Sequence, residues 1–365
     1  MATGPRAPAA EAVTSGRLDV LVDAVQTNCD IADARHAADL PLCIYLLQMR
    51  EFYRWEHGLT FGAAIDRGAL GAWLAHREAR WAELEAREFV PLPWGGARFD
   101  PLDTPALNAE LAPLGLAYGA GWAGVERPAF FLAQLRFQQQ RDDGLLLQVC
   151  GREHARGLTA PPAALLGGQT IVLRREALAR WLWEKFETFS LRRADGPFKA
   201  FAEAYGLHDP GDFAAALPRM VDEQSETLLL HELGEHRAGE WLEPGWAAMR
   251  LALGARRTEL QVRAVRDQLA DLEVTLPALI KRRADAGLHF WFANYDGVRE
   301  RLYPSLVKGY AAWRDGDGGR ALLDAAQGGA RHFRRLARQV LLLHARHRAD
   351  ATTAIDRLQI GRAHV

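Results

Sequence analysis

The chain has 365 residues, of which 49% are hydrophobic and 25% are charged, an ordinary composition for a globular protein. Its 45 basic and 46 acidic residues give a formal net charge of −1, which does not favour nucleic acid as a partner. No apolar run approaches the roughly 20 residues needed to cross a bilayer, and three cysteines are too few for a disulfide framework. We therefore expect a soluble cytoplasmic protein with no membrane partner.

The two ends of the chain are interpreted separately from the rest. Residues 1–16 lack the apolar segment of a signal peptide, so we expect a short disordered tail there. Residues 360–365 read Ile-Gly-Arg-Ala-His-Val. A common short-read sequencing adapter encodes that hexapeptide when it is translated. We interpret 360–365 as an adapter-derived artefact and leave it out of the reasoning on fold and site.

Residues 17–90 carry the clearest helical periodicity and form the expected N-terminal helical part. Apolar residues recur three and four positions apart from Leu18 through Val25 and Ala32 to His36, the spacing of one buried helix face. A second helix is expected through Leu46 and on to Tyr53. The short join predicts that the two helices are antiparallel neighbours.

Residues 91–175 change character and predict an α+β insertion. Apolar and polar side chains alternate between Phe131 and Gln138, and the turn sequence Arg141-Asp-Asp-Gly follows. This pattern predicts a β-hairpin over 130–150. A third strand is expected near 170–173.

Residues 176–358 return to helical spacing and predict a C-terminal helical bundle. The expected fold is thus mainly α (α+β). It is a helical bundle in which the N-terminal pair docks on the C-terminal helices, with a small antiparallel β-hairpin insertion.

The densest group of chemically active side chains lies at 231–236, His-Glu-Leu-Gly-Glu-His. His231-Glu232-x-x-x-His236 resembles the HExxxH motif of the dipeptidyl-peptidase III type of zinc peptidase. That resemblance implies His231 and His236 as zinc ligands and Glu232 as the general base. Histidines five residues apart diverge by roughly 140° on a regular helix, so both could bind one ion only if the helix bulges.

A second hypothesis takes the pairs that share a helix face. His231 and Glu235 are four residues apart on the more apolar stripe. On the first helices, Asp33 lies three residues before His36, and Glu51 aligns with apolar positions. Carboxylate and imidazole groups that face one interior from several helices are typical of non-haem iron sites. We therefore expect a metal-binding protein, iron or zinc being the candidates, and specifically a non-haem iron oxidoreductase. Its predicted ligands are Asp33, His36, Glu51, His231 and Glu235.

Two other interpretations remain open from the sequence. Glu51 is also explained as the partner of Arg50, Arg54 or Arg35, and His36 as a core histidine, since buried ion-pair networks imitate functional sites. The whole chain is also compatible with a non-enzymatic scaffold that binds a small molecule or a protein.

Three blocks carry a resemblance to a known family. They are NCDIADARHA at 28–37, CIYLLQMREFYRWE at 43–56 and HFWFAN at 289–294. Together they resemble an uncharacterised bacterial family classed as a domain of unknown function. The resemblance extends over most of the chain and implies no activity, substrate or cofactor. It implies only that the N-terminal pair and the C-terminal helices belong to one unit.

Overall fold

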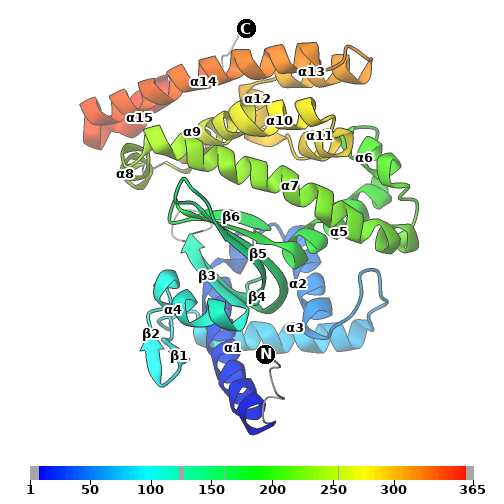
Figure 1. The fold of residues 1–365 in the computed structure, drawn as a ribbon, viewed down its shortest axis with the longest axis vertical. Helices are drawn as coiled ribbons and strands as arrows, with labels where there is room; N and C mark the ends of the chain where they lie inside the picture. The colour runs from blue at the N-terminus through cyan, green and yellow to red at the C-terminus, as the bar shows by residue number, and fades with distance from the viewer. Residues whose placement is uncertain (1–7, 123–126, 160, 254, 359–365) are drawn as a thin grey trace, which may run out of the picture. The chain divides into compact units, whose positions relative to one another are not determined.

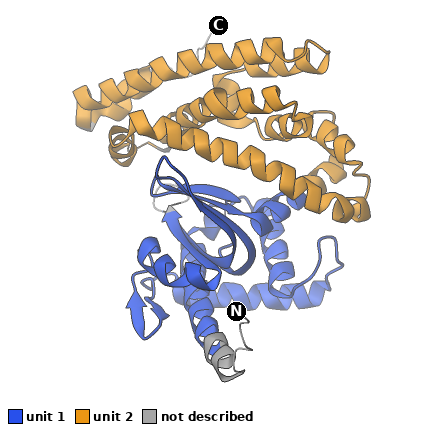
Figure 2. Cartoon of the chain, in the orientation of Figure 1, with its two compact units in different colours: residues 1–184 blue, residues 185–365 orange. Residues whose placement is uncertain are grey.

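The computed structural model describes residues 8–122, 127–159, 161–253 and 255–358. It divides into two compact units, residues 1–184 and 185–365 (Figure 2). Helix α5, Arg175–Arg192, runs through the boundary between them. The two halves are therefore separate compact units and not the one unit that the family resemblance implied. The expected boundary at residues 175 and 176 falls at the first residue of α5.

Unit 1 combines helices with two sheets. Its elements before α5 are α1 Pro8–His36, α2 Leu42–Glu56, α3 Arg67–Leu84, β1 Leu92–Trp94, β2 Ala97–Phe99, α4 Thr104–Leu111, β3 Leu116–Trp122, β4 Pro128–Gln140, β5 Leu146–Arg156, β6 Ala163–Leu166 and β7 Thr170–Arg174. Helix α1 begins within the stretch 1–16 that we expected to be a disordered tail. Residues 1–7 and the adapter-like residues 360–365 lie outside the described residues.

The larger sheet of unit 1 has five strands in the order β3-β4-β5-β7-β6 and is strongly curled (Figure 1). Strands β4 and β5 pair antiparallel and form the hairpin that the alternating pattern predicts. Their turn closes where Arg141 N–H donates to the Leu145 carbonyl at 2.9 Å. Gly144 lies there at φ 81°, a conformation that costs glycine little. Strand β7 then pairs parallel to β5, so the sheet is mixed.

The expected fold, a helical bundle with a small antiparallel hairpin insertion, is wrong. Unit 1 is an α+β unit built around the curled five-stranded sheet. The apolar stripe of α1 is buried as its period predicts, and Val25 and Cys29 are 0% and 1% exposed. That stripe packs against Tyr118, Phe130 and other strand residues of the same unit. A helical period shows that one face is buried, but not what buries it.

Unit 2 is helical throughout its described residues. After α5 its elements are α6 Pro197–Tyr205, α7 Pro210–Leu242, α8 Gly245–Ala252, α9 Arg256–Ala270, a π-helical segment Asp271–Thr275, α10 Leu276–Arg282, α11 Asp285–Ala293, α12 Gly297–Leu302, α13 Ser305–Arg314, α14 Arg320–His347 and α15 Ala351–Arg357. The long helix α7 starts at an Asp209 cap, whose carboxylate accepts from Gly211 N–H at 2.7 Å and Asp212 N–H at 3.0 Å.

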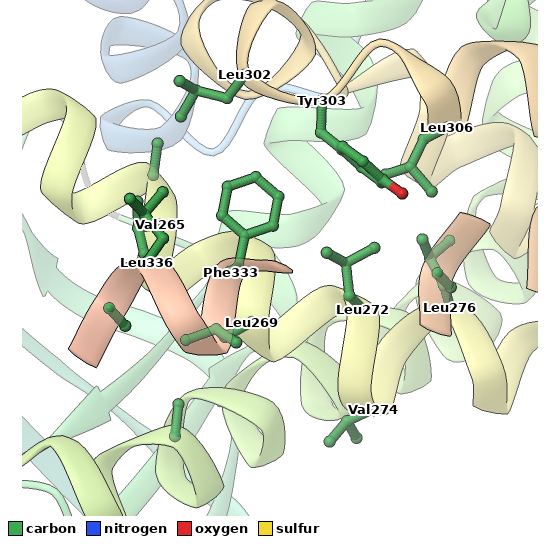
Figure 3. Close-up of a cluster of buried hydrophobic side chains, with 14 of the residues drawn as sticks. Val265, Leu269, Leu272, Val274, Leu276, Leu302, Tyr303, Leu306, Phe333 and Leu336 are labelled. Atoms are coloured by element: carbon green, nitrogen blue, oxygen red, sulfur yellow. The ribbon is translucent and has the colours of Figure 1, made fainter. Parts of the chain in front are cut away.

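The core of unit 2 gathers on α9 and the π-helical segment that follows it. Phe333 of α14 and Tyr303 point into the same cluster as Leu269 and Leu272 (Figure 3). The Phe333 and Tyr303 rings meet edge to face, with centroids 5.6 Å apart. Helix α9 is in contact with both α14 and α7.

Two sequence expectations about the environment can be compared with the structure. Within the described ranges, no helix combines the length and hydropathy that a bilayer crossing requires. The thiols of Cys29, Cys43 and Cys150 are all free, as we expected from their number.

Candidate metal centre

Helices α7 and α9 approach each other closely at Gly234. A Cβ placed on Gly234 would lie 2.5 Å from the Ala270 carbonyl oxygen and 2.7 Å from the Ala270 Cα. Only glycine allows this approach, because any side chain would overlap the backbone of α9. The contact point lies between His231 and Glu235 on one helix and between Asp267 and Asp271 on the other. The crossing therefore brings four titratable side chains to one place.

Three of these side chains could share one metal ion. A ring nitrogen of His231 and a carboxylate oxygen each of Glu235 and Asp267 lie within 4.8 Å of one another. All three residues are partly buried. Ligand bonds near 2 Å place donor atoms around one ion about 3 Å apart, so small side-chain rotations would close the set. We call these three residues the histidine–carboxylate cluster.

The fourth side chain, Asp271, fixes the orientation of the histidine. Its Oδ1 lies 2.8 Å from His231 Nδ1, and its Oδ2 accepts from Arg299 Nη1 at 3.0 Å. Burial alone would lower the pKa of His231, but the Asp271 carboxylate beside it raises that pKa to about 10. With Nδ1 engaged, Nε2 is the nitrogen left for a ligand. A carboxylate behind a histidine is the arrangement found at many metal sites.

Glu235 has one engaged and one unengaged oxygen. Arg266 Nε lies 2.5 Å from Glu235 Oε2, and Arg266 Nη1 also lies 3.0 Å from Glu243 Oε1. Glu235 Oε1 is buried and accepts no hydrogen bond from any described residue. Burial raises the pKa of Glu235 to about 7, while Arg266 opposes that rise. A buried oxygen without a donor is costly, and a bound cation would relieve that cost.

The helix that carries Asp267 is irregular next to the cluster. Asp271–Thr275 is π-helical and joins α9 to α10 without a break. Pro277 follows, and proline cannot donate the hydrogen bond that an α-helix would send to Glu273. The wider turn accommodates this loss. Its first residue, Asp271, is directed at His231, which is consistent with the frequent occurrence of π-helical turns at functional sites.

The HExxxH residues divide between the cluster and its surroundings. His231 belongs to the cluster, whereas His236 and Glu232 belong to no group of three potential ligands among the described residues. The second potential ligand on α7 is therefore Glu235, four residues after His231, whereas the zinc-peptidase hypothesis requires His236. This geometry favours the pair on the apolar stripe.

The predicted ligands of unit 1 are each engaged within that unit. Glu51 is 2% exposed and is paired with Arg54 and with Arg50, whose Nε lies 3.0 Å from Glu51 Oε1. His36 lies 3.5 Å from Asp39. Asp33 accepts the Leu158 backbone N–H at 2.7 Å. Within the described part of unit 1 these side chains do not meet in a group of three potential ligands.

Asp33 nevertheless makes a testable electrostatic prediction. Burial raises its pKa to about 7. The folded protein is therefore destabilised when this carboxyl ionises. That destabilisation is absent at low pH and complete above about pH 7. An asparagine can still accept from Leu158. Asp33→Asn should therefore become more stable relative to the unchanged chain by about 2 to 3 kcal/mol between pH 5 and pH 8. Urea unfolding at both pH values measures this, and a pH-independent difference would contradict it.

Sequence reasoning missed Asp267 and Asp271. The four-residue spacing of Glu259, Arg263, Asp267 and Asp271 is equally typical of a surface ion-pair row. Asp271 is in fact 1% exposed. The one available signal was the glycine between His231 and Glu235, since a glycine inside a long helix often marks a close approach.

The fold and this cluster define a class: a two-unit α+β protein whose helical unit carries a histidine and carboxylates at a helix crossing. Models of a family of unknown function (DUF6866) match almost the whole chain, the N-terminal domain model over residues 20–174 and the C-terminal domain model over residues 179–362. The chain belongs to this family. No curated protein and no solved structure matches it.

Proposed function

We propose that the chain is a metal-binding protein whose C-terminal unit holds one divalent transition-metal ion through His231, Glu235 and Asp267. The observation that carries the proposal is the convergence of these three donor groups within 4.8 Å. Two of these residues also have a neighbour that would hold a metal ligand in place. Asp271 contacts the ring of His231, and Arg266 pairs with Oε2 of Glu235.

The donor set restricts the metal. One imidazole and two carboxylates suit iron(II), manganese and zinc, and they do not suit copper(I), which prefers sulfur. We propose iron(II) first. Three protein ligands leave coordination positions open, which is the mark of a catalytic and not a structural centre. A non-haem iron oxidoreductase is the activity that follows from such a centre.

Protons compete with the metal for this site. The Asp271 carboxylate raises the pKa of His231, and burial raises the pKa of Glu235. Binding must displace protons from these groups, so the affinity for metal should rise with pH. Measurements of metal binding are therefore best made at pH 8.

Metal analysis of protein purified without chelator tests the proposal. We expect close to one equivalent of metal per chain, and below one-tenth of an equivalent for His231→Gln. His236→Gln is the matched control on the same helix and should keep its metal. Loss of metal from both variants would support the zinc-peptidase set instead. Less than about a tenth of an equivalent in the unchanged protein would contradict any formed multi-ligand site.

We place the protein in the cytoplasm, because free thiols at all three cysteines suit a reducing compartment. We also propose that it acts on a small molecule and binds neither nucleic acid nor a membrane. The balanced charge of the whole chain supports this.

A further inference from the structure

A polar pocket of about 330 Å³ lies within unit 1, apart from the metal centre. Its walls come from α2, from the segment around 158–162 and from α5. The lining side chains that matter here are Gln48, Arg127, Thr159, Arg180, Trp181 and Glu184. A cavity of this size falls within the range that binds a small molecule. Its wall carries two guanidinium groups and one carboxylate.

The guanidinium group of Arg180 makes a long contact with a buried carboxylate. Its Nη1 lies 3.5 Å from Glu153 Oε2, which is longer than a normal charge-assisted hydrogen bond. Glu153 is fully buried and is also the close partner of Arg174. Glu176 and Glu184 also lie within electrostatic range of Arg180. The Arg180 side chain lines the pocket, where its N–H groups can reach a ligand.

A third arginine, Arg156, lies near Arg180. Arg156 is 0% exposed, and none of its three guanidinium nitrogens has a hydrogen-bond acceptor among the described residues. Its guanidinium instead stacks on Phe52 at 4.6 Å and Trp55 at 5.1 Å. Arg156 and Arg180 lie within electrostatic range of each other. Arg156 does not line the pocket, and the carboxylates of Glu153 and Asp33 also lie within its electrostatic range.

The negatively charged wall of the pocket, at Glu184, restricts the class of ligand that can bind. Glu184 accepts from Gln48 Nε2 at 2.9 Å and lines the same pocket as Arg180. A doubly charged phosphate would be repelled by this carboxylate, whereas a ligand with both a carboxylate and an ammonium group would match both walls. Arg127, which donates to the His36 carbonyl at 2.8 Å, adds a second guanidinium to the pocket.

We propose that this pocket binds a small zwitterion of the α-amino acid class. The ligand carboxylate contacts Arg180 and Arg127, and the ligand ammonium contacts Glu184. Planar guanidinium groups suit a carboxylate because two parallel hydrogen bonds can form. The site is independent of the metal centre, since its residues all lie in unit 1.

Isothermal titration of the full-length protein with each of the twenty amino acids tests the proposal. At least one should bind with a Kd below 1 mM, and its N-acetyl derivative should bind at least tenfold more weakly. Arg180→Gln should weaken that binding by at least about tenfold, the typical effect of losing a charged hydrogen-bond partner. Arg192→Gln removes an exposed arginine from the same helix and should leave binding unchanged.

Arg180 is buried, so Arg180→Gln can lose stability for reasons unrelated to a ligand. Variants of two less buried residues, Arg127 and Glu184, therefore test the same contacts by their binding of the amino acid and of its N-acetyl derivative. Arg127→Gln should weaken the amino acid and its N-acetyl derivative alike. Glu184→Gln should weaken only the amino acid. Failure of all twenty amino acids to bind, tighter binding of inorganic phosphate than of any of them, or amino acid binding by the Arg127 and Glu184 variants as tight as that of the unchanged protein would overturn the proposal.

Discussion

Replacing Gly234 by alanine should destabilise the C-terminal unit and weaken metal binding together. The new Cβ would overlap the Ala270 backbone, at 2.5 Å from its oxygen, so α7 and α9 must separate. Such overpacking costs about 1 to 3 kcal/mol, which outweighs the gain of about 1 kcal/mol that alanine brings to a helix interior. The same separation moves His231 and Glu235 away from Asp267. We expect at least a tenfold loss of metal affinity, because ligand geometry tolerates little displacement.

Gly239→Ala is the matched control for this experiment. Gly239 lies on the same helix, and a Cβ there would meet nothing closer than Arg266 Nη2 at 3.6 Å, an ordinary contact. This variant should keep its metal affinity and gain up to about 1 kcal/mol of stability. Urea unfolding and metal titration of both variants make the comparison. Equal behaviour of the two would show that the close crossing at Gly234 does not position the cluster.

The largest loss of stability is expected from Phe333→Ala. Phe333 is 1% exposed and fills the space among Tyr303, Leu269 and Leu272 (Figure 3). Removing a fully buried phenyl ring typically costs about 3 to 5 kcal/mol, through lost burial and the cavity that remains. The cavity would open beside the π-helical segment that carries Asp271. Chemical unfolding of the full chain measures the change in the free energy of unfolding.

Leu342→Ala provides the control on the same helix, α14. Leu342 is 56% exposed, so its truncation should change the free energy of unfolding by no more than about 0.5 kcal/mol. A loss below about 1 kcal/mol for Phe333→Ala would mean that the cluster in Figure 3 is not the core of unit 2.

The fold could be predicted element by element but not in its assembly. The stripe through Val25 and Cys29 is buried as its period predicts, and the hairpin of β4 and β5 forms where alternation predicts it. What the stripe packs against depends on contacts remote in sequence. Cys29 Sγ, for example, lies 3.2 Å from the Phe130 carbonyl, 101 residues further on. No local pattern encodes such a pairing, and for that reason a sheet-centred unit was taken for part of a helical bundle.

The candidate site was predictable to the same extent. The pair His231 and Glu235 follows from i,i+4 spacing on an apolar stripe, and the structure places both at one crossing. The partners Asp267 and Asp271 could not be chosen from the many acidic residues in helices, because the choice depends on which helices cross at Gly234. The partners of the buried Glu51, by contrast, could be predicted from the sequence, because its two arginines lie one and three residues away.

An anomalous-scattering map from crystals of the full-length protein grown with iron(II) tests the metal centre most directly. We predict one strong peak at the α7–α9 crossing, within about 2.3 Å of His231 Nε2 and of one carboxylate oxygen each of Glu235 and Asp267. A peak bound by His236, or a map with no peak at this crossing while Arg266 still pairs with Glu235, would contradict the assignment.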